Sequence, residues 1–162
     1  MGTKPSRGDK APDFELPNDH GDKLSLASFA GKMLVLYFYP KDDTTGCTKE
    51  AIDFNGLKHE FEGIGAIVTG VSPDPVASHV KFKTKHKLGF GLLSDESKKM
   101  LEDYGVWAEK SMYGRTYMGV VRTTFLIGRD QKILEIWDKV KVPGHAAAVL
   151  ATVKALAGER TG

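Results

Sequence analysis

The sequence predicts an α/β fold in which a central mixed sheet is flanked by helices. Two observations carry this prediction. Apolar runs typical of strands alternate with amphipathic segments typical of helices, and a strand pair joined by a polar turn follows late in the chain. The length fits a single domain over residues 1–162, because single domains most often contain about 100–150 residues.

The strongest strand signal is the run MLVLYFY at residues 33–39, which Pro40 closes. A short run that is apolar at every position is typical of a strand covered on both faces, so we expect it at the centre of the sheet in parallel pairing. Residues 11–31 predict short extended pieces with turns. AIVTGVS at 66–72 predicts a second strand, and GLLSDES at 91–97 begins with a short third one.

Helices are expected between these strands. Cys47, Ala51 and Phe54 recur at helical spacing and predict a helix over about residues 46–61, with Cys47 in its first turn on the core side. Three further helices are predicted at residues 74–86, at about 97–104 and at 144–156.

The segment 105–121 is rich in glycine and aromatic residues and is expected to be a loop. RTTFLIG at 122–128 and KILEIWD at 132–138 are separated by a polar turn and predict a β-hairpin. The aromatic side chains of the loop suit either packing in a core or lining the mouth of a site: Trp107, Tyr113 and Tyr117.

The charge balance, the length of the apolar runs and the first ten residues each argue against a class of protein. Lys plus Arg is 23 and Asp plus Glu is 21, and the resulting formal charge of +2 does not indicate a nucleic-acid or anionic-membrane partner. The longest apolar run falls far short of the ~20 residues of a membrane helix. The first ten residues lack the apolar core of a signal peptide. We therefore expect a cytoplasmic protein.

Cysteine and histidine usage narrows the chemistry further. Cys47 is the only cysteine, which excludes an intrachain disulfide, a multi-thiolate zinc site and Cys-x-x-Cys oxidoreductase chemistry. The five histidines show no metal-ligand spacing. We expect neither a metal nor a cofactor.

Cys47 follows the polar loop at 41–46 and stands in the first turn of a predicted helix. Unpaired N–H groups and the positive end of the helix dipole favour a thiolate over a thiol at such a position. Position alone leaves two interpretations open, a reactive thiolate and an inert, buried small residue.

A resemblance decides between them. Pro40, Thr44 and Cys47 fit the pattern Pro-x-x-x-Thr-x-x-Cys, which resembles the active-site signature of the peroxiredoxins. YPKDDTTGCTKE is similar to the loop of the peroxiredoxin Q, or bacterioferritin comigratory protein, subfamily. Further similar segments follow in the same order as in that subfamily: APDFELP at 11–17, LLSDES at 92–97, and residues 105–127 with Arg122 at the family's active-site arginine.

The resemblance implies a thioredoxin-like fold and reduction of hydrogen peroxide or organic hydroperoxides. Cys47 would attack the peroxide and become a sulfenic acid. Arg122 would stabilise the thiolate and the charge that develops on the oxygens. The Thr44 hydroxyl would bond the peroxide and also the thiolate, since a hydroxyl donates and accepts at once.

Three supporting roles are implied in the same way. Pro40 has no N–H and would shield the thiolate without competing for a hydrogen bond. Backbone N–H groups near Gly46 and Cys47 would donate to the peroxide oxygens. Glu50, three residues after Cys47, would pair with Arg122 and orient it, although a solvated helix charge is the alternative.

The chain departs from the subfamily pattern at two positions. Thr45 stands where proline usually precedes Gly-Cys, which leaves the rigidity of the loop open. Ile52 stands where many members have a resolving cysteine, so the thiol that resolves the sulfenic acid must come from outside the chain. We expect it to come from thioredoxin, glutaredoxin or glutathione, with Cys47 of a second copy as the alternative. A redox sensor or holdase that signals through oxidised Cys47 is the alternative function. We expect a monomer, because no long exposed apolar segment requires a partner.

Overall fold

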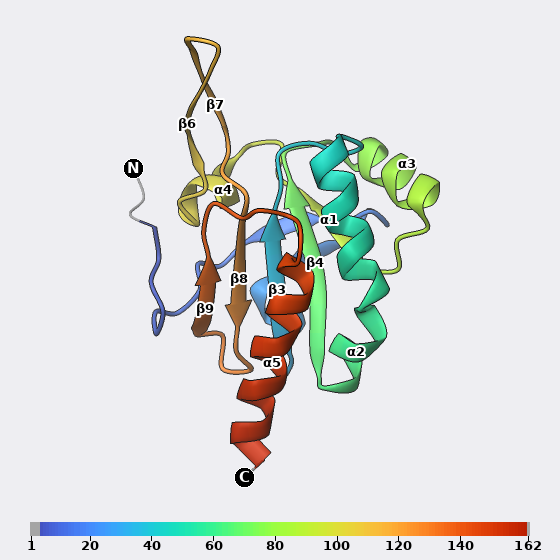
Figure 1. Cartoon of the computed structure of the whole chain (residues 1–162), viewed down its shortest axis with the longest axis vertical. Coiled ribbons are helices and arrows are strands. Elements are labelled where there is room, and N and C mark those ends of the chain that lie inside the picture. Colours follow the sequence, from blue (N-terminus) through green and yellow to red (C-terminus); the bar gives the residue numbers. More distant parts are fainter. Residues whose placement is uncertain (1–3, 162) are drawn as a thin grey trace.

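A five-stranded mixed sheet forms the centre of the computed structural model, which describes residues 4–161 (Figure 1). Residues 1–3 and 162, at the ends of the expected domain, lie outside the described residues. The strand order is β5-β4-β3-β8-β9. The strands span these residues: β3 Met33–Phe38, β4 Ala66–Ser72, β5 Gly91–Ser94, β8 Thr123–Ile127 and β9 Ile133–Trp137.

The central position expected for the apolar run belongs to β3. It pairs in parallel with β4, as expected, but antiparallel with β8 on its other side. Successive side chains of a strand point to opposite faces. The side chains of Met33, Val35 and Tyr37 accordingly enter one apolar cluster, and those of Leu34, Leu36 and Phe38 enter another. A strand covered on both faces needs apolar residues throughout, which explains the unbroken run.

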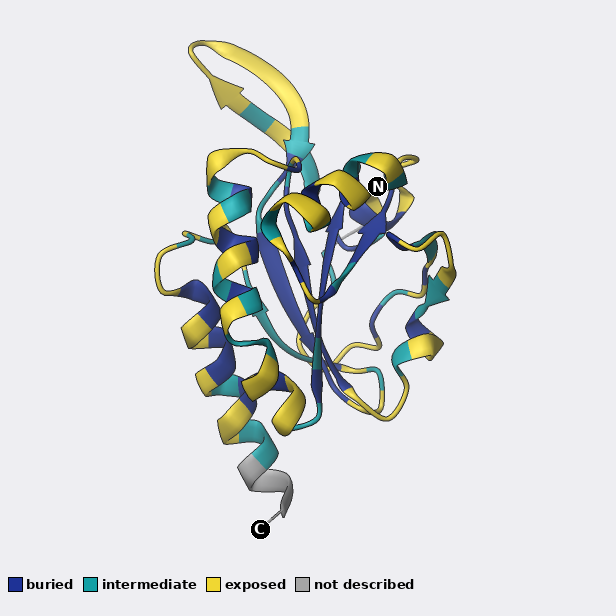
Figure 2. Ribbon diagram, turned by 90° about the vertical axis from the view of Figure 1, so that its right-hand side faces the viewer, coloured by how far each residue is buried: buried dark blue, intermediate teal, exposed yellow. Residues whose placement is uncertain are grey.

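Helices cover both faces of this sheet, which Figure 2 shows nearly edge-on. The first cluster receives side chains from α1 (Thr45–Gly56), α2 (Lys58–Gly63), α3 (Val76–His86) and α5 (His145–Thr161). The second lies beneath α4 (Lys99–Asp103), the 3₁₀ turn η1 (Leu26–Phe29) and the strand pair β1 (Glu15–Pro17) and β2 (Lys23–Ser25). Over the described residues, no helix is both long and apolar enough to cross a membrane.

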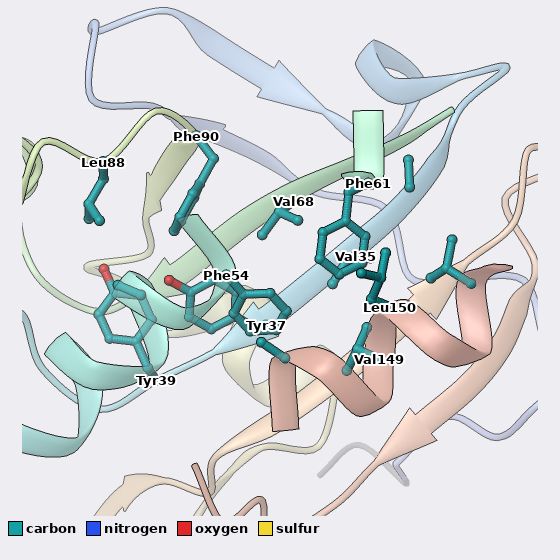
Figure 3. Close-up of a cluster of buried hydrophobic side chains, with 14 of the residues drawn as sticks. Val35, Tyr37, Tyr39, Phe54, Phe61, Val68, Leu88, Phe90, Val149 and Leu150 are labelled. Atoms are coloured by element: carbon teal, nitrogen blue, oxygen red, sulfur yellow. The ribbon is translucent and has the colours of Figure 1, made fainter. Parts of the chain in front are cut away.

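Stacked aromatic rings hold α1 on the sheet. The Tyr37 ring stacks on Phe54 of α1 at 4.8 Å and on Tyr39 at 5.5 Å between ring centroids. Figure 3 shows these rings together in the first cluster, next to α5. Ala51 and Phe54 are completely buried. This packing fixes the helix that carries Cys47.

Two predictions about secondary structure were wrong in detail. The helix expected over 46–61 is broken at Leu57, which adopts a non-helical backbone directly after Gly56, a residue with low helix propensity. The expected loop at 105–121 is largely a hairpin of β6 (Trp107–Met112) and β7 (Arg115–Val120). Its two-residue turn, Tyr113-Gly114, has positive φ at both residues, as hairpin turns of this length require.

The hairpin stands out from the body of the molecule (Figures 1 and 2). Tyr113 at its tip is 97% exposed and Tyr117 is 43% exposed, so neither packs in a core. Trp107, at the base, packs against the second cluster. The hairpin strands therefore lead the chain out from the core and back to Arg122 just before β8.

Candidate active site

Cys47 is the third residue of α1, in its first turn, as predicted, and only 1% of it is exposed. The loop that leaves β3 carries Pro40 and ends at Thr44, the residue that caps α1 with an extended backbone. The side chain of Cys47 faces the first apolar cluster together with Ala51 and Phe54. Solvent therefore has almost no access to the thiol in this arrangement.

The guanidinium of Arg122 joins two residues of α1. Its Nη2 donates to the Cys47 sulfur at 3.3 Å, and its Nη1 donates to Glu50 Oε1 at 2.6 Å. Arg122 directly precedes Thr123, the first residue of β8, and its carbonyl accepts from the Val140 N–H at 2.9 Å. A planar, permanently charged fork held from both sides is well suited to stabilise a thiolate.

Glu50 is almost completely buried, with 1% of its side chain exposed. Its Oε1 accepts from Arg122, while Oε2 is buried without a hydrogen-bond partner among the described residues. Burial raises the pKa of Glu50 to about 7, although Arg122 acts in the opposite direction. Burial also opposes the charge of Arg122, but Glu50 and Cys47 outweigh it and raise the pKa of Arg122. Burial and the charge of Arg122 thus act in opposite directions on the ionisation of Glu50.

Gly46 lets Arg122 lie close over the first turn of α1. A Cβ atom at position 46 would come within 3.3 Å of Arg122 Nη2, tighter than an ordinary contact. A glycine at this position therefore leaves room for the guanidinium beside Cys47. Pro40 is half-buried in the loop and directly follows the buried Tyr39.

The Thr44 hydroxyl does not make the bond to sulfur that the resemblance implies. It is exposed and donates to the carbonyl of Lys41 at 2.9 Å, and no hydrogen bond joins it to Cys47 in the described part of the chain. Since this bond uses its only proton, the oxygen of Thr44 is available as an acceptor.

Two further groups at the site were not singled out by the sequence. The hydroxyl of Tyr37 is buried without a hydrogen-bond partner among the described residues, and burial, together with Glu50 and Cys47, raises the pKa of Tyr37 well above its usual value. His145 Nε2 lies 2.8 Å from the Thr124 hydroxyl, and burial, then the charge of Arg122, lowers the pKa of His145 to about 4. Neither residue belongs to a short motif that could have indicated its position.

Comparisons with known proteins show which family has this sequence and this fold. Residues 7–136 match the model of the AhpC/TSA family. A peroxiredoxin of Bacillus subtilis is 48% identical over 147 residues, which cover 91% of this chain and 94% of that protein. A peroxiredoxin Q variant of Xylella fastidiosa superposes with a TM-score of 0.91 at 41% identity, covering 96% of this chain and 99% of the other.

A third relative connects this fold to a reaction. The bacterioferritin comigratory protein of Xanthomonas campestris, studied for its alkyl peroxide reduction activity, superposes with a TM-score of 0.85 at 44% identity. The alignment covers 89% of this chain and 92% of that one. The chain has a thioredoxin-like fold and belongs to the AhpC/TSA family, as a peroxiredoxin of the Q, or bacterioferritin comigratory protein, type.

Proposed function

We propose that this peroxiredoxin reduces hydrogen peroxide and organic hydroperoxides with Cys47 as its single redox centre, and that an external thiol completes each cycle. One observation carries the proposal: Arg122 donates to the Cys47 sulfur at 3.3 Å while Glu50 holds its other arm. A cation fixed beside a cysteine favours the thiolate, which is the nucleophilic form.

In the first half of the cycle, the Cys47 thiolate attacks the nearer oxygen of the peroxide. The S–O bond forms as the O–O bond breaks, and the sulfur is oxidised by two electrons. The proton of the attacked oxygen passes to the leaving oxygen, so the products are a sulfenate and water or an alcohol. Arg122 stabilises the charge that moves from sulfur to oxygen in this step.

The loop supplies the remaining contacts to the peroxide. The Thr44 oxygen, whose own proton goes to Lys41, accepts the O–H of the peroxide and orients it. The N–H groups of Gly46 and Cys47, in the first turn of α1, donate to the peroxide oxygens. Pro40 shields the thiolate from water without offering an N–H that would compete.

In the second half, an external thiol attacks the sulfenic sulfur and releases water, and a second thiol frees Cys47 from the mixed disulfide. Thioredoxin, glutaredoxin and glutathione are the candidate donors, and a reducing cytoplasm would supply them. Because only 1% of Cys47 is exposed, the first turn of α1 must open to admit the donor. Apart from the external thiols, one copy of the chain contains every group that this cycle uses, so a monomer suffices.

Counting turnovers separates this function from that of a redox sensor or holdase. With a thioredoxin system, glutaredoxin with glutathione, or a small dithiol as donor, we expect the wild-type protein to consume many equivalents of peroxide, and Cys47→Ser to consume none. A coupled assay of donor oxidation measures this. Consumption that stops near one equivalent with every donor would contradict the peroxidase and support the sensor.

Arg122→Ala should slow the oxidation of Cys47 by about a hundredfold or more, because it removes the fixed donor that stabilises the transition state. Arg122→Lys keeps the charge but not the planar fork of the guanidinium. Its rate constant for Cys47 oxidation should lie between those of Arg122→Ala and the wild type. Rapid quenching with intact-mass detection gives the rate constants. Arg129→Ala, in the exposed turn after β8, is the matched control. If Arg122→Ala reacts at the wild-type rate, Arg122 has no part in the mechanism.

Thr44→Val keeps the shape of the side chain and removes the acceptor oxygen. It should slow the reaction with peroxide far more than the reaction with a bulky alkylating reagent, because only peroxide uses that oxygen. Both rate constants are measured on the same samples, with Thr116→Val on the exposed face of β7 as the control. Equal losses for the two reagents would show that Thr44 is merely structural.

Without a reductant, excess peroxide should drive Cys47 to sulfinic and sulfonic acid, because no second thiol traps the sulfenic acid. Ile52 is 48% exposed and lines a surface hollow of about 370 Å³ with Thr48 and Lys49. Five residues along a helix rise about 7.5 Å, and positions 47 and 52 lie on different faces, so they cannot form a disulfide while α1 is intact.

Ile52→Cys should nevertheless form an intrachain disulfide and slow this overoxidation, provided that α1 opens. Intact-mass measurement after peroxide treatment distinguishes the products, and Ile52→Ser controls for the loss of the apolar side chain. A wild-type protein that stops as a stable sulfenic acid without reductant would contradict unresolved overoxidation.

A further inference from the structure

A second buried network lies beside the active-site loop, and the mechanism above does not use it. Asp42, a loop residue, is 7% exposed. Its Oδ1 accepts from the Tyr39 hydroxyl at 2.6 Å, and its Oδ2 accepts from the Ser78 hydroxyl at 2.8 Å and lies 2.7 Å from His79 Nδ1. The backbone N–H of Asp42 donates to Asp74 Oδ2 at 2.8 Å. The loop is thus tied to the ends of β3 and β4 and to α3.

The two ring nitrogens of His79 establish where its protons lie. The residue is completely buried, and its Nε2 lies 2.9 Å from the carbonyl oxygen of Leu93 in β5. A carbonyl oxygen only accepts, so Nε2 carries a proton. Nδ1 faces the carboxylate of Asp42, which already accepts from two hydroxyls, so Nδ1 donates as well. An imidazolium paired with a buried carboxylate satisfies both of these contacts at once.

The same geometry decides between a proton and a metal ion. The donor atoms of Asp42, Asp74 and His79 all lie within 4.8 Å of one another, close enough for a shared cation. Both ring nitrogens of His79 point at oxygen acceptors, which leaves no lone pair for a metal. A bound proton therefore accounts for this cluster of side chains.

The groups that face His79 are the carboxylates of Asp42 and Asp74, the Tyr39 hydroxyl and the Leu93 carbonyl. Burial opposes the charge, but Asp42, the Leu93 carbonyl and Asp74 outweigh it and raise the pKa of His79 above 6.5. The contribution of the charged His79–Asp42 pair to the stability of the fold is therefore complete below pH 6.5. It is lost as the pH rises through the raised pKa of His79.

We propose that His79 is a positioning residue for the peroxide reaction: as an imidazolium it holds Asp42, and through Asp42 it fixes the loop that places Thr44 and the first turn of α1 beside Arg122. The inference rests on the proposed peroxidase function. The loop has only one residue, Asp43, between Asp42 and Thr44. A shift of Asp42 therefore displaces the acceptor oxygen and the N–H groups that bind the peroxide.

The test compares rate constants for Cys47 oxidation, measured by rapid quenching and intact-mass detection. The pH values lie above the pKa of Glu50, which burial raises to about 7. His79→Gln can donate only one of the two bonds and should react about tenfold more slowly near neutral pH, the equivalent of one lost hydrogen bond to a charged group. His59→Gln is the matched control, because 97% of the His59 side chain is exposed on α2.

Nitrogen NMR of histidine-labelled wild-type protein reports the state of His79 directly. We expect both ring nitrogens to be protonated at neutral pH, and the wild-type rate constant to follow the protonated fraction of His79 as the pH rises. His79→Gln should lose this dependence and His59→Gln should keep it. If His79→Gln does not fold, the agreement of the wild-type titration and rate profile decides the question.

Three results would overturn the proposal: a His79 ring with one unprotonated nitrogen near neutral pH, a rate profile that does not follow its titration, or a folded His79→Gln that matches the wild type. Failure of the peroxidase function is a different result. In that case the wild-type protein itself does not consume peroxide, while the NMR spectrum still reports the imidazolium.

Discussion

The guanidinium of Arg122, held between the Cys47 sulfur and the Glu50 carboxylate, is the interaction on which the site depends. Its two partners lie 72 and 75 residues before it in the sequence, and the register of the sheet brings all three residues together. Phe38, the last residue of β3, pairs with Thr123, the first of β8. The loop to α1 therefore leaves the sheet at the same edge at which Arg122 arrives.

Burying these charges is energetically unfavourable, and the cost is visible at two groups of the site. Glu50 has one unpaired oxygen and a pKa of about 7, and the Tyr37 hydroxyl nearby has no partner among the described residues. Such groups gather where function, and not stability, determines the residue. His79 Nδ1 and Asp42 Oδ2, which lie 2.7 Å apart, form a second buried contact of the loop. Two buried pairs thus hold the segment that begins at Asp42 and ends at Glu50.

The sequence predicted those features that depend on local patterns. The continuous apolar run gave the central strand, and helical spacing placed Cys47 in the first turn of α1. The β6–β7 hairpin was missed because its turn places Tyr113, an uncommon residue at positive φ, before Gly114. The pairing of His79 with Asp42 joins positions 37 residues apart, which no spacing rule predicts. Arg122 was identified only through the family resemblance.

The central claim is that the site accelerates attack on an O–O bond specifically, beyond supplying a thiolate. The most direct measurement is the ratio of two rate constants for wild-type Cys47, one for hydrogen peroxide and one for an alkylating reagent, compared with the same ratio for glutathione. Donors preorganised around the reacting oxygens should raise this ratio by a factor on the order of a hundred to a thousand. A ratio equal to that of glutathione would show that Cys47 is only an ordinary thiolate, and would contradict the account.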